Sequence, residues 1–269
     1  MTPLTIVIVS YNCLSDLEVC LASLAAAPAR IAHDIVVVDN QSTDGTAASL
    51  RQRWPQVTLL EPGANLGFSA ANNLALRHTR GPLVLLLNPD TVVPTGAIDR
   101  MVTWLTARPD VALVGPRILD ADGRAELSFG AMMAPWHEWR QKLLVLGHDR
   151  RLPLVSGFVE RTTRVSKPVD WVSGACMLGR RADLAAVGLF DERFFLYTED
   201  VDLCASIRSR GRAVWFLADV EITHRRGRSG SAAPAATRAA YRRSHVAFYE
   251  KHHPRWAPVL RAYLKIRGQ

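Results

Sequence analysis

Short apolar runs along the first third of the chain alternate with segments that have helical spacing. The runs cover residues 4–9, 35–38, 57–60 and 83–87, and continuous runs of this length are typical of strands covered on both faces. After the first run, leucines recur three or four positions apart, at Leu14, Leu17, Leu21 and Leu24. Strands that alternate with helices predict βαβ units, and therefore an α/β fold with a mostly parallel central sheet flanked by helices.

The apolar pattern is less regular in the rest of the chain. The third run leads into a segment rich in Gly and Asn, which we expect to be a loop. Further on, four residues have helical spacing: Trp136, Trp139, Leu143 and Leu146. We expect strands at 169–178 and 213–217, with a helix at about 200–210 between them. The small residues of 229–236 predict a linker before a C-terminal helical appendage at 231–269.

The composition is that of a folded protein without a membrane-spanning segment. Apolar residues make up 48% of the chain, and no apolar stretch approaches the ~20 residues that cross a bilayer. Residues 1–12 lack a basic leader and a cleavage site, so they indicate a buried strand and not a signal peptide. The four cysteines lack metal-site spacing and predict reduced thiols in a cytoplasmic protein: Cys13, Cys20, Cys176 and Cys204.

Positive charge is concentrated at the C-terminal end. Residues 225–269 contain eleven Lys and Arg and one acid, a net charge of +10, whereas the whole chain carries +8. We expect this end to meet an acidic partner, either anionic lipid or a diphosphate, and not nucleic acid, because it has no recognisable nucleic-acid module. Its last residues are amphipathic, with Trp256, Val259, Leu260, Tyr263 and Leu264 on one face. This pattern fits a helix at a membrane interface and equally a helix docked on the domain.

Polar residues follow three of the predicted strands, at Ser10, Asp39 and Asp90. Ligands of open α/β sheets bind beyond the carboxyl ends of the strands, so all three are candidate site residues. Asp39 could cap the next helix or accept the imide N–H of uracil or thymine. Asp90 could shape a turn or bind a divalent cation together with phosphate oxygens.

A second acidic group, residues 199–202, precedes the helix expected at about 200–210. If Thr198 is the N-cap, Asp200 shares an apolar face with Leu203, Cys204 and Ile207, while Glu199 and Asp202 project to the opposite side. An acid on an inward face is not explained by the helix dipole, and burial raises its pKa toward that of a general base. We therefore expect Asp200 to be a base and Glu199 to be a positioning group.

His224 follows the strand expected at 213–217 and opens a loop of Gly, Ser and Arg, a composition that suits phosphate binding. Its imidazole could bind a metal shared with Asp90.

Seven features occur in one order along the chain: VIVSYN at 7–12, VVVDNQSTDGT at 36–46, NLGFSAANN at 65–73, LLLNPDT at 85–91, WVSGACML at 171–178, FDERFFLYTEDVDLC at 190–204, and His224. Together they resemble family 2 glycosyltransferases, particularly the bacterial rhamnosyltransferase-like branch. The resemblance implies an inverting enzyme of the GT-A, Rossmann-like fold over residues 1–230. About 1–115 would bind the nucleotide sugar, and about 116–230 would bind the acceptor and carry catalysis. One departure is Asn88-Pro89-Asp90, where many relatives have two acids.

The resemblance also implies roles by position. Ser10, Tyr11, Asn12 and Asp39 would line the nucleoside pocket, and Asn65 and Gly67 would lie beside the donor. Asp90 and His224 would hold Mg²⁺ or Mn²⁺ on the diphosphate. Asp200 would deprotonate the acceptor, helped by Glu199, while Trp171, Gly174 and Ala175 would face the acceptor.

The expected function is transfer of L-rhamnose from dTDP-L-rhamnose to a lipid-linked saccharide, in synthesis of cell-envelope polysaccharide. The basic C-terminus would hold the protein on the inner face of the plasma membrane. One alternative is a UDP-hexose or UDP-N-acetylhexosamine transferase on the same fold. A second is a non-catalytic scaffold that binds nucleotide sugars. A dinucleotide-binding dehydrogenase is disfavoured, because the first strand is not followed by G-x-G-x-x-G.

Overall fold

The first half of the chain forms alternating strands and helices. The computed structural model describes residues 2–26, 28–225 and 234–266. The four predicted strands are present as β1 (Leu4–Ser10), β2 (His33–Asp39), β3 (Thr58–Leu60) and β4 (Leu83–Leu87). The helices between them are α1 (Leu14–Ala26), α2 (Thr46–Arg53) and α3 (Gly67–His78). The loop expected after the third run is present at residues 61–66. The helix α3 that follows it was not predicted, and its Ala71, Ala75 and Leu76 bury an apolar face against the sheet.

The second half begins with short elements that the sequence pattern did not reveal. They are β5 (Thr91–Val92), α4 (Ala97–Thr106), β6 (Val111–Leu119) and β7 (Phe129–Gly130). The predicted tryptophan-containing helix is α5 (Pro135–Asp149), and it is followed by α6 (Pro153–Thr162) and β8 (Lys167–Val169).

The single strand expected at 169–178 was wrong. The segment is split into β9 (Trp171–Val172) and β10 (Cys176–Arg180), which belong to different sheets. Ser173, Gly174 and Ala175 lie between them and reach the cavity described below. The remaining elements of this part are α7 (Arg181–Ala186), α8 (Glu199–Ser209) and β11 (Ala213–His224), so the predicted helix at 200–210 and the following strand are confirmed.

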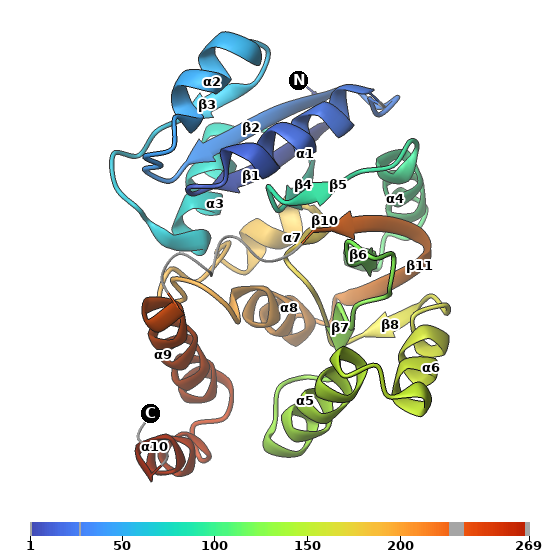
Figure 1. The fold of residues 1–269 in the computed structure, drawn as a ribbon, viewed down its shortest axis with the longest axis vertical. Coiled ribbons are helices and arrows are strands. Elements are labelled where there is room, and N and C mark those ends of the chain that lie inside the picture. The colour runs from blue at the N-terminus through green and yellow to red at the C-terminus, as the bar shows by residue number, and fades with distance from the viewer. Residues whose placement is uncertain (1, 27, 226–233, 267–269) are drawn as a thin grey trace.

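Within the described residues, nine strands form one central sheet, in the order β3-β2-β1-β4-β10-β6-β11-β5 with β8 paired to β11 (Figure 1). Only β10, β5 and β8 run against the common strand direction. Residues of α1 and α4 pack on one face of the sheet, and residues of α3, α7 and α8 pack on the other. The predicted α/β fold with a mostly parallel sheet is therefore confirmed.

The C-terminal segment contributes α9 (Pro234–His252) and α10 (Ala257–Ile266). Phe248 and Tyr249 of α9 pack with Phe194 and Val201, next to the start of α8, and Leu260 of α10 lies against the same cluster. The linker expected at 229–236 falls mostly outside the described residues. None of the described helices has the length and apolar character needed to cross a bilayer. The four cysteines are buried free thiols.

Candidate active site

A cavity of about 810 Å³ opens at the carboxyl ends of β1, β2 and β4 and extends to the start of α8. Its wall includes nine of the residues proposed from sequence: Tyr11, Asn65, Gly67, Asp90, Gly174, Ala175, Glu199, Asp200 and His224. These residues come from six separate segments of the chain, and the fold brings them together in one place. The cavity lies at the strand ends, as the rule predicted, although of the three strand-end candidates only Asp90 lines it.

Four other candidates do not line this cavity. Ser10 is fully buried, with its Oγ 3.3 Å from the Sγ of Cys13. Asn12 joins two loops, because its Oδ1 accepts a hydrogen bond from the Thr43 N–H. Asp39 accepts the N–H of Ser42 and does not cap α2, whose N-cap is Gly45. Trp171 donates from Nε1 to the carbonyl of Ala131. The binding roles of these four residues stay predictions.

Asp200 lies in the first turn of α8 with its carboxylate held by two backbone donors. Gly174 N–H donates to Oδ2 at 2.9 Å, and Val201 N–H donates to Oδ1 at 2.8 Å. Burial raises the pKa of Asp200 above its usual range, and the two N–H groups oppose that rise. The carboxyl group therefore takes up a proton more readily than an ordinary aspartate, while the two N–H groups stabilise its ionised form.

Glu199, beside Asp200, is buried without such support. It is 7% exposed, and its Oε2 has no hydrogen-bond partner within the described residues. Burial, and then the nearby charge of Asp200, raise the pKa of Glu199 well above its usual value. Of two adjacent carboxyls, the one without donors holds a shared proton more readily. Glu199 is therefore the member of the pair with the stronger tendency to hold a proton.

Glu199 and Asp202 were expected on the side of α8 opposite to its apolar face, and that expectation did not foresee that both are buried. Asp202 is 2% exposed and accepts hydrogen bonds from Lys251 Nζ at 2.9 Å and His252 Nε2 at 2.7 Å. The reason is that α9 covers the side of α8 that the helical pattern left open to solvent. A long-range contact of this kind leaves no local signal in the sequence.

The start of α8 also contains an unusual backbone. Tyr197 and Thr198 have φ values of 68° and 71°, in the left-handed region that side chains with a Cβ rarely occupy. Thr198 is the N-cap, as predicted, but its side chain makes no capping hydrogen bond. Strained backbone of this kind is concentrated at functional sites.

Asp90 and His224 meet at the opposite part of the cavity wall, where β5 pairs with the end of β11. The Nε2 of His224 lies 3.1 Å from Asp90 Oδ1, and its Nδ1 lies 3.6 Å from Glu126 Oε2. Burial opposes a charge on this imidazole, but the two carboxylates outweigh it and raise the pKa of His224 to about 9.

These groups suit a hard divalent cation only with help from a ligand. No group of three or more His, Cys, Asp or Glu side chains able to hold a metal occurs among the described residues. Asp90 and His224 supply two donor atoms, and Mg²⁺ sites commonly complete their coordination with substrate phosphates and water. The residues present therefore fit a cation bound jointly with a diphosphate, and its binding would release the imidazole proton.

Several cavity residues were not found by sequence reasoning. Asn40 holds the loop at 65–67, because its Nδ2 donates to Asn65 Oδ1 and its Oδ1 accepts the Leu66 N–H. Asn40 follows Asp39 at a strand end, so the strand-end rule could have included it. Phe195 also lines the cavity, and its carbonyl would lie 2.5 Å from a Cβ at Gly67, which requires glycine there. Glu126 does not line the cavity but lies 3.6 Å from His224; it comes from an irregular loop and left no signal.

The fold is that of GT-A glycosyltransferases. A mannosyltransferase of Pyrobaculum calidifontis, solved with GDP-mannose and Mn²⁺, superposes with a TM-score of 0.64 at 23% identity, over 97% of this chain and 69% of its own. GalNAc-T7, solved with UDP, GalNAc and Mn²⁺, gives 0.63 at 15% identity, over 86% of this chain and 44% of its own.

Sequence comparison gives the family. Residues 2–258 match the family described as glycosyltransferase like family 2. A Mycobacterium tuberculosis relative, named N-acetylglucosaminyl-diphospho-decaprenol L-rhamnosyltransferase, is 33% identical over 98% of this chain and 91% of its own length. A rhamnosyltransferase of Escherichia coli is 30% identical over 60% of this chain and 62% of its own. This chain therefore belongs to the family 2 glycosyltransferases, and the resemblance stated from its motifs is confirmed.

Proposed function

We propose that this chain transfers L-rhamnose from dTDP-L-rhamnose to a hydroxyl group of a polyprenyl-diphosphate-linked saccharide, with inversion at the anomeric carbon. The observation that carries the proposal is the placement of two kinds of group on one cavity wall. Asp90 and His224 suit a cation and a diphosphate, while Glu199 and Asp200 are acids of the kind that activate a hydroxyl. The name of the mycobacterial relative supports the choice of sugar and acceptor.

In this proposal Asp200 is the general base. Its carboxylate accepts the proton of the acceptor hydroxyl, whose oxygen attacks the anomeric carbon while the bond from that carbon to the diphosphate breaks. One in-line displacement inverts the configuration. The N–H groups of Gly174 and Val201 keep the Asp200 carboxylate oriented and ionised before the reaction.

Glu199 is proposed to position a substrate. Its neutral carboxyl can donate a hydrogen bond from the oxygen that lacks a protein partner. A sugar hydroxyl in the cavity would supply the missing acceptor.

The leaving diphosphate is proposed to lie at Asp90 and His224, which would hold Mg²⁺ or Mn²⁺. When bound, the cation neutralises the charge that develops on the diphosphate. The basic C-terminal segment is proposed to bring the protein to an anionic membrane surface, where a lipid-linked acceptor is found.

A transfer assay tests the proposal. The purified chain is incubated with Mn²⁺, a diphosphate-linked GlcNAc acceptor on a short prenyl chain, and either dTDP-L-rhamnose, UDP-glucose or UDP-GlcNAc. We expect a rhamnosylated product whose new linkage, read by NMR, has the anomeric configuration opposite to that of the donor. Preference for a UDP-sugar would replace the proposed donor. If donors raise the unfolding temperature but no sugar is transferred, the protein is a non-catalytic scaffold.

A further inference from the structure

Two helices at one end of the molecule expose the same pattern of apolar side chains. On α5 the exposed residues are Trp136, Trp139, Leu143 and Leu146, and at α10 they are Trp256, Val259, Tyr263 and Ile266. Each set has the spacing i, i+3, i+7 and i+10, which places its members on one side of a helix. These eight side chains are between 45% and 86% exposed. We call the two sets together the apolar face.

On α5 the usual distribution of residues is reversed. A surface helix normally buries its apolar stripe and turns its charges to water. Here Glu138 points inward, where its carboxylate accepts hydrogen bonds from His245 Nε2 and from Tyr249 Oη at 2.5 Å. The rings of Trp136 and Trp139 lie 4.9 Å apart on the outside. The helix is thus held to α9 by its acid, and its apolar stripe is left for something else to cover.

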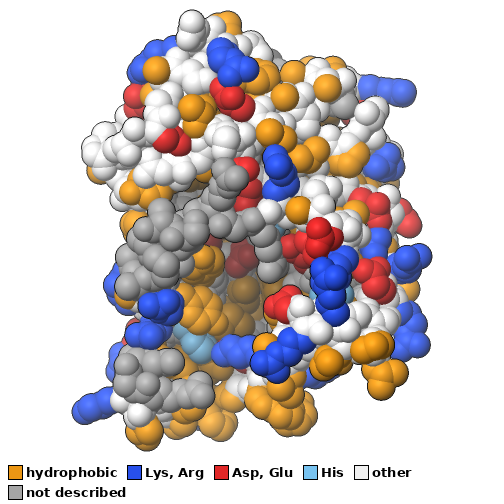
Figure 2. All heavy atoms as spheres, viewed as in Figure 1, with side chains coloured by type: hydrophobic (Ala, Val, Ile, Leu, Met, Phe, Trp, Pro, Cys, Tyr) orange, Lys and Arg blue, Asp and Glu red, His pale blue; other side chains and the backbone are white. Residues whose placement is uncertain are grey.

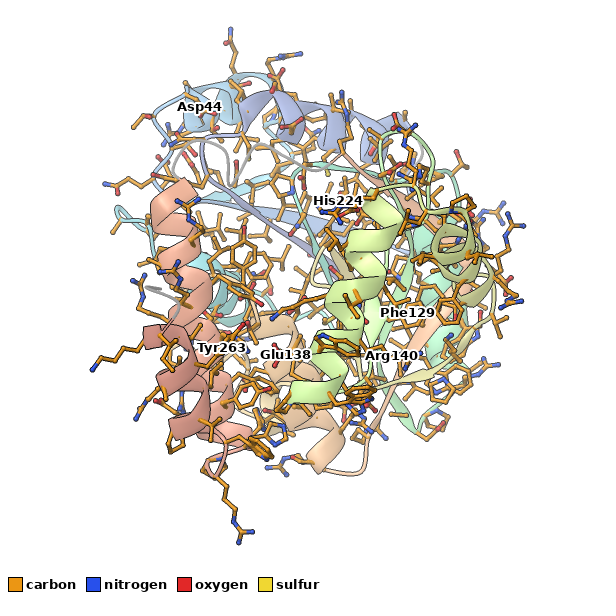
Figure 3. All side chains as sticks on the ribbon, turned by 60° about the horizontal axis from the view of Figure 1, so that its bottom comes forward. Asp44, Phe129, Glu138, Arg140, His224 and Tyr263 are labelled. Atoms are coloured by element: carbon orange, nitrogen blue, oxygen red, sulfur yellow. The ribbon has the colours of Figure 1, made fainter. Side chains whose placement is uncertain are left out.

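The two stripes lie at the same end of the protein. Met132 and Met133, just before α5, pack on the same cluster as Leu260 of α10, and the Nε2 of His253 lies 2.7 Å from the carbonyl of Met133. Figure 1 places α5 and α10 at the end opposite to α1 and α2, and Figure 3, turned to bring that end forward, shows Tyr263 and Arg140 on the two helices. Hydrophobic side chains gather along this end in Figure 2.

Basic side chains occur on all three helices at this end of the molecule. A groove of about 440 Å³ between α9 and α10, on the side of α10 away from its exposed stripe, is lined by Arg242, Arg243, Arg261 and Lys265. Its one acid, Glu250, is already paired with Arg261. On α5, Arg140 and Lys142 are exposed on either side of the tryptophan stripe. Anionic headgroups would complement these charges.

We infer that the apolar face lies on an anionic lipid bilayer, with α5 and α10 parallel to its surface and their tryptophans at headgroup level. Tryptophan, tyrosine and basic side chains on one amphipathic surface are the combination that binds at membrane interfaces. A second copy of this chain fits less well, because it would bring the same basic side chains against each other. The inference rests on the proposed function for its biological sense, since that function places the acceptor in a membrane.

α9 connects this face to the cavity. Near its middle, Ser244 donates to the carbonyl of Leu196, and the Tyr241 ring lies 6.0 Å from that of Tyr197; both Leu196 and Tyr197 line the cavity. His253, beside α5, lies nine residues further on, about 14 Å at the helical rise of 1.5 Å per residue. A diphosphate saccharide whose lipid stays in the bilayer would need to span a distance of this order.

Vesicle flotation of the full chain tests the inference. We expect the wild type to float with vesicles that contain phosphatidylglycerol and not with pure phosphatidylcholine. W136S/W139S should bind at least about tenfold more weakly, because it removes two large side chains from the apolar face, whereas W136F/W139F should retain binding. V19S, which changes an exposed residue of α1 at the other end, is the matched control and should float like the wild type. All these positions are exposed, so unfolding temperatures should stay close to that of the wild type.

Transfer to a water-soluble, short-prenyl acceptor separates this inference from the proposed function. W136S/W139S should match the wild type there and fall behind only with a polyprenyl acceptor in vesicles. A chain that floats as expected but transfers no sugar would defeat the proposed function and leave the membrane face standing. Equal flotation of W136S/W139S and wild type would overturn the inference. A wild-type dimer that W136S/W139S dissociates, with no vesicle binding by either, would also overturn it and assign the face to self-association.

Discussion

The starts of α8 and α5 both bury a glutamate, with opposite consequences. In α8, Glu199 has an oxygen without a partner and lies beside Asp200, and its pKa is raised. In α5, burial would also raise the pKa of Glu138, but hydrogen bonds from His245 and Tyr249 outweigh it and lower that pKa. Burial of an acid therefore does not define its role; its partners do.

The comparison distinguishes a structural acid from a chemical one. A buried carboxylate that has all its donors fixes two elements against each other, as Glu138 fixes α5 to α9. A buried carboxyl that lacks a hydrogen-bond donor makes the folded state less stable. Such a group is expected where a bound ligand supplies the missing hydrogen bond. By this criterion we propose that Glu199 takes part in binding a ligand, whereas Glu138 belongs to the scaffold.

The largest effect on the transfer rate is expected for Asp200→Asn. It removes the proposed base but keeps the shape of the side chain, so the transfer rate should fall by about 10²–10⁴-fold. The rise in unfolding temperature caused by the donor should remain, because the diphosphate site is untouched. Asp122→Asn, at an exposed position outside the cavity, is the control and should keep full activity. A wild-type rate in Asp200→Asn would remove Asp200 from the role of base.

The pH dependence of transfer should reflect the raised pKa of Asp200. A base must be deprotonated, so kcat/KM should fall about tenfold per pH unit below that pKa and level off above it. Because the pKa lies above the usual value for aspartate of about 3.9, the fall should begin at a higher pH than for an ordinary aspartate. A rate that stays flat down to pH 4, with the protein still folded, would contradict the assignment.

Asp202→Asn should lower the free energy of unfolding and leave the transfer rate unchanged. Asp202 is buried, and its loss leaves Lys251 and His252 without their shared carboxylate on α8. The unfolding free energy should fall by about 3 kcal/mol, as expected when one member of a buried ion pair is removed. Chemical denaturation measures this loss. An unchanged midpoint would mean that α9 is not held to α8 through this contact.

The smallest effect on the free energy of unfolding is expected for Lys142→Ala. Lys142 pairs with Glu138 one helical turn away but is itself exposed, so its removal should cost less than about 1 kcal/mol. The same denaturation experiment applies. A loss as large as that of Asp202→Asn would show that the charge of Lys142, and not the donors on α9, keeps Glu138 in place.

Much of the central sheet could be predicted because each buried parallel strand can be recognised in the local sequence as a continuous apolar run, such as residues 83–87. The strand ends then indicated Asp90, and helical spacing selected Asp200, which lines the cavity but is less buried than Glu199 and Asp202. α3 was missed because Gly67, Asn72 and Asn73 are poor helix formers that favour a loop, although half of its residues are Ala, Leu or Arg, and tertiary contacts hold the asparagines within the helix. One of these is the hydrogen bond from Asn73 to the carbonyl of Phe190.

The rest of the site depends on contacts between distant segments. Glu126 contacts His224, which is about a hundred residues away in the sequence, and Lys251 contacts Asp202, which is forty-nine residues away. The exposure of Trp136 and Trp139 was equally hidden, since helical spacing gives the direction of a stripe relative to its helix and not relative to the protein. The C-terminal pattern allowed either a helix docked on the domain or a helix at a membrane interface. In the structure, one of its apolar residues, Leu260, packs inward, whereas Trp256 and Val259 are exposed.

The most direct test of the account is a paired substitution, Glu199→Met and Glu138→Met, measured for unfolding temperature and for transfer to a soluble acceptor. Methionine keeps the length of the side chain and removes its polar atoms. We predict that Glu199→Met unfolds at a temperature equal to or above that of the wild type and loses transfer, because an unsatisfied acid is replaced by an apolar group. Glu138→Met should unfold several degrees lower and keep its transfer rate, because His245 and Tyr249 lose their acceptor. Destabilisation of both variants to the same extent, with equal transfer rates, would contradict the distinction between the two acids.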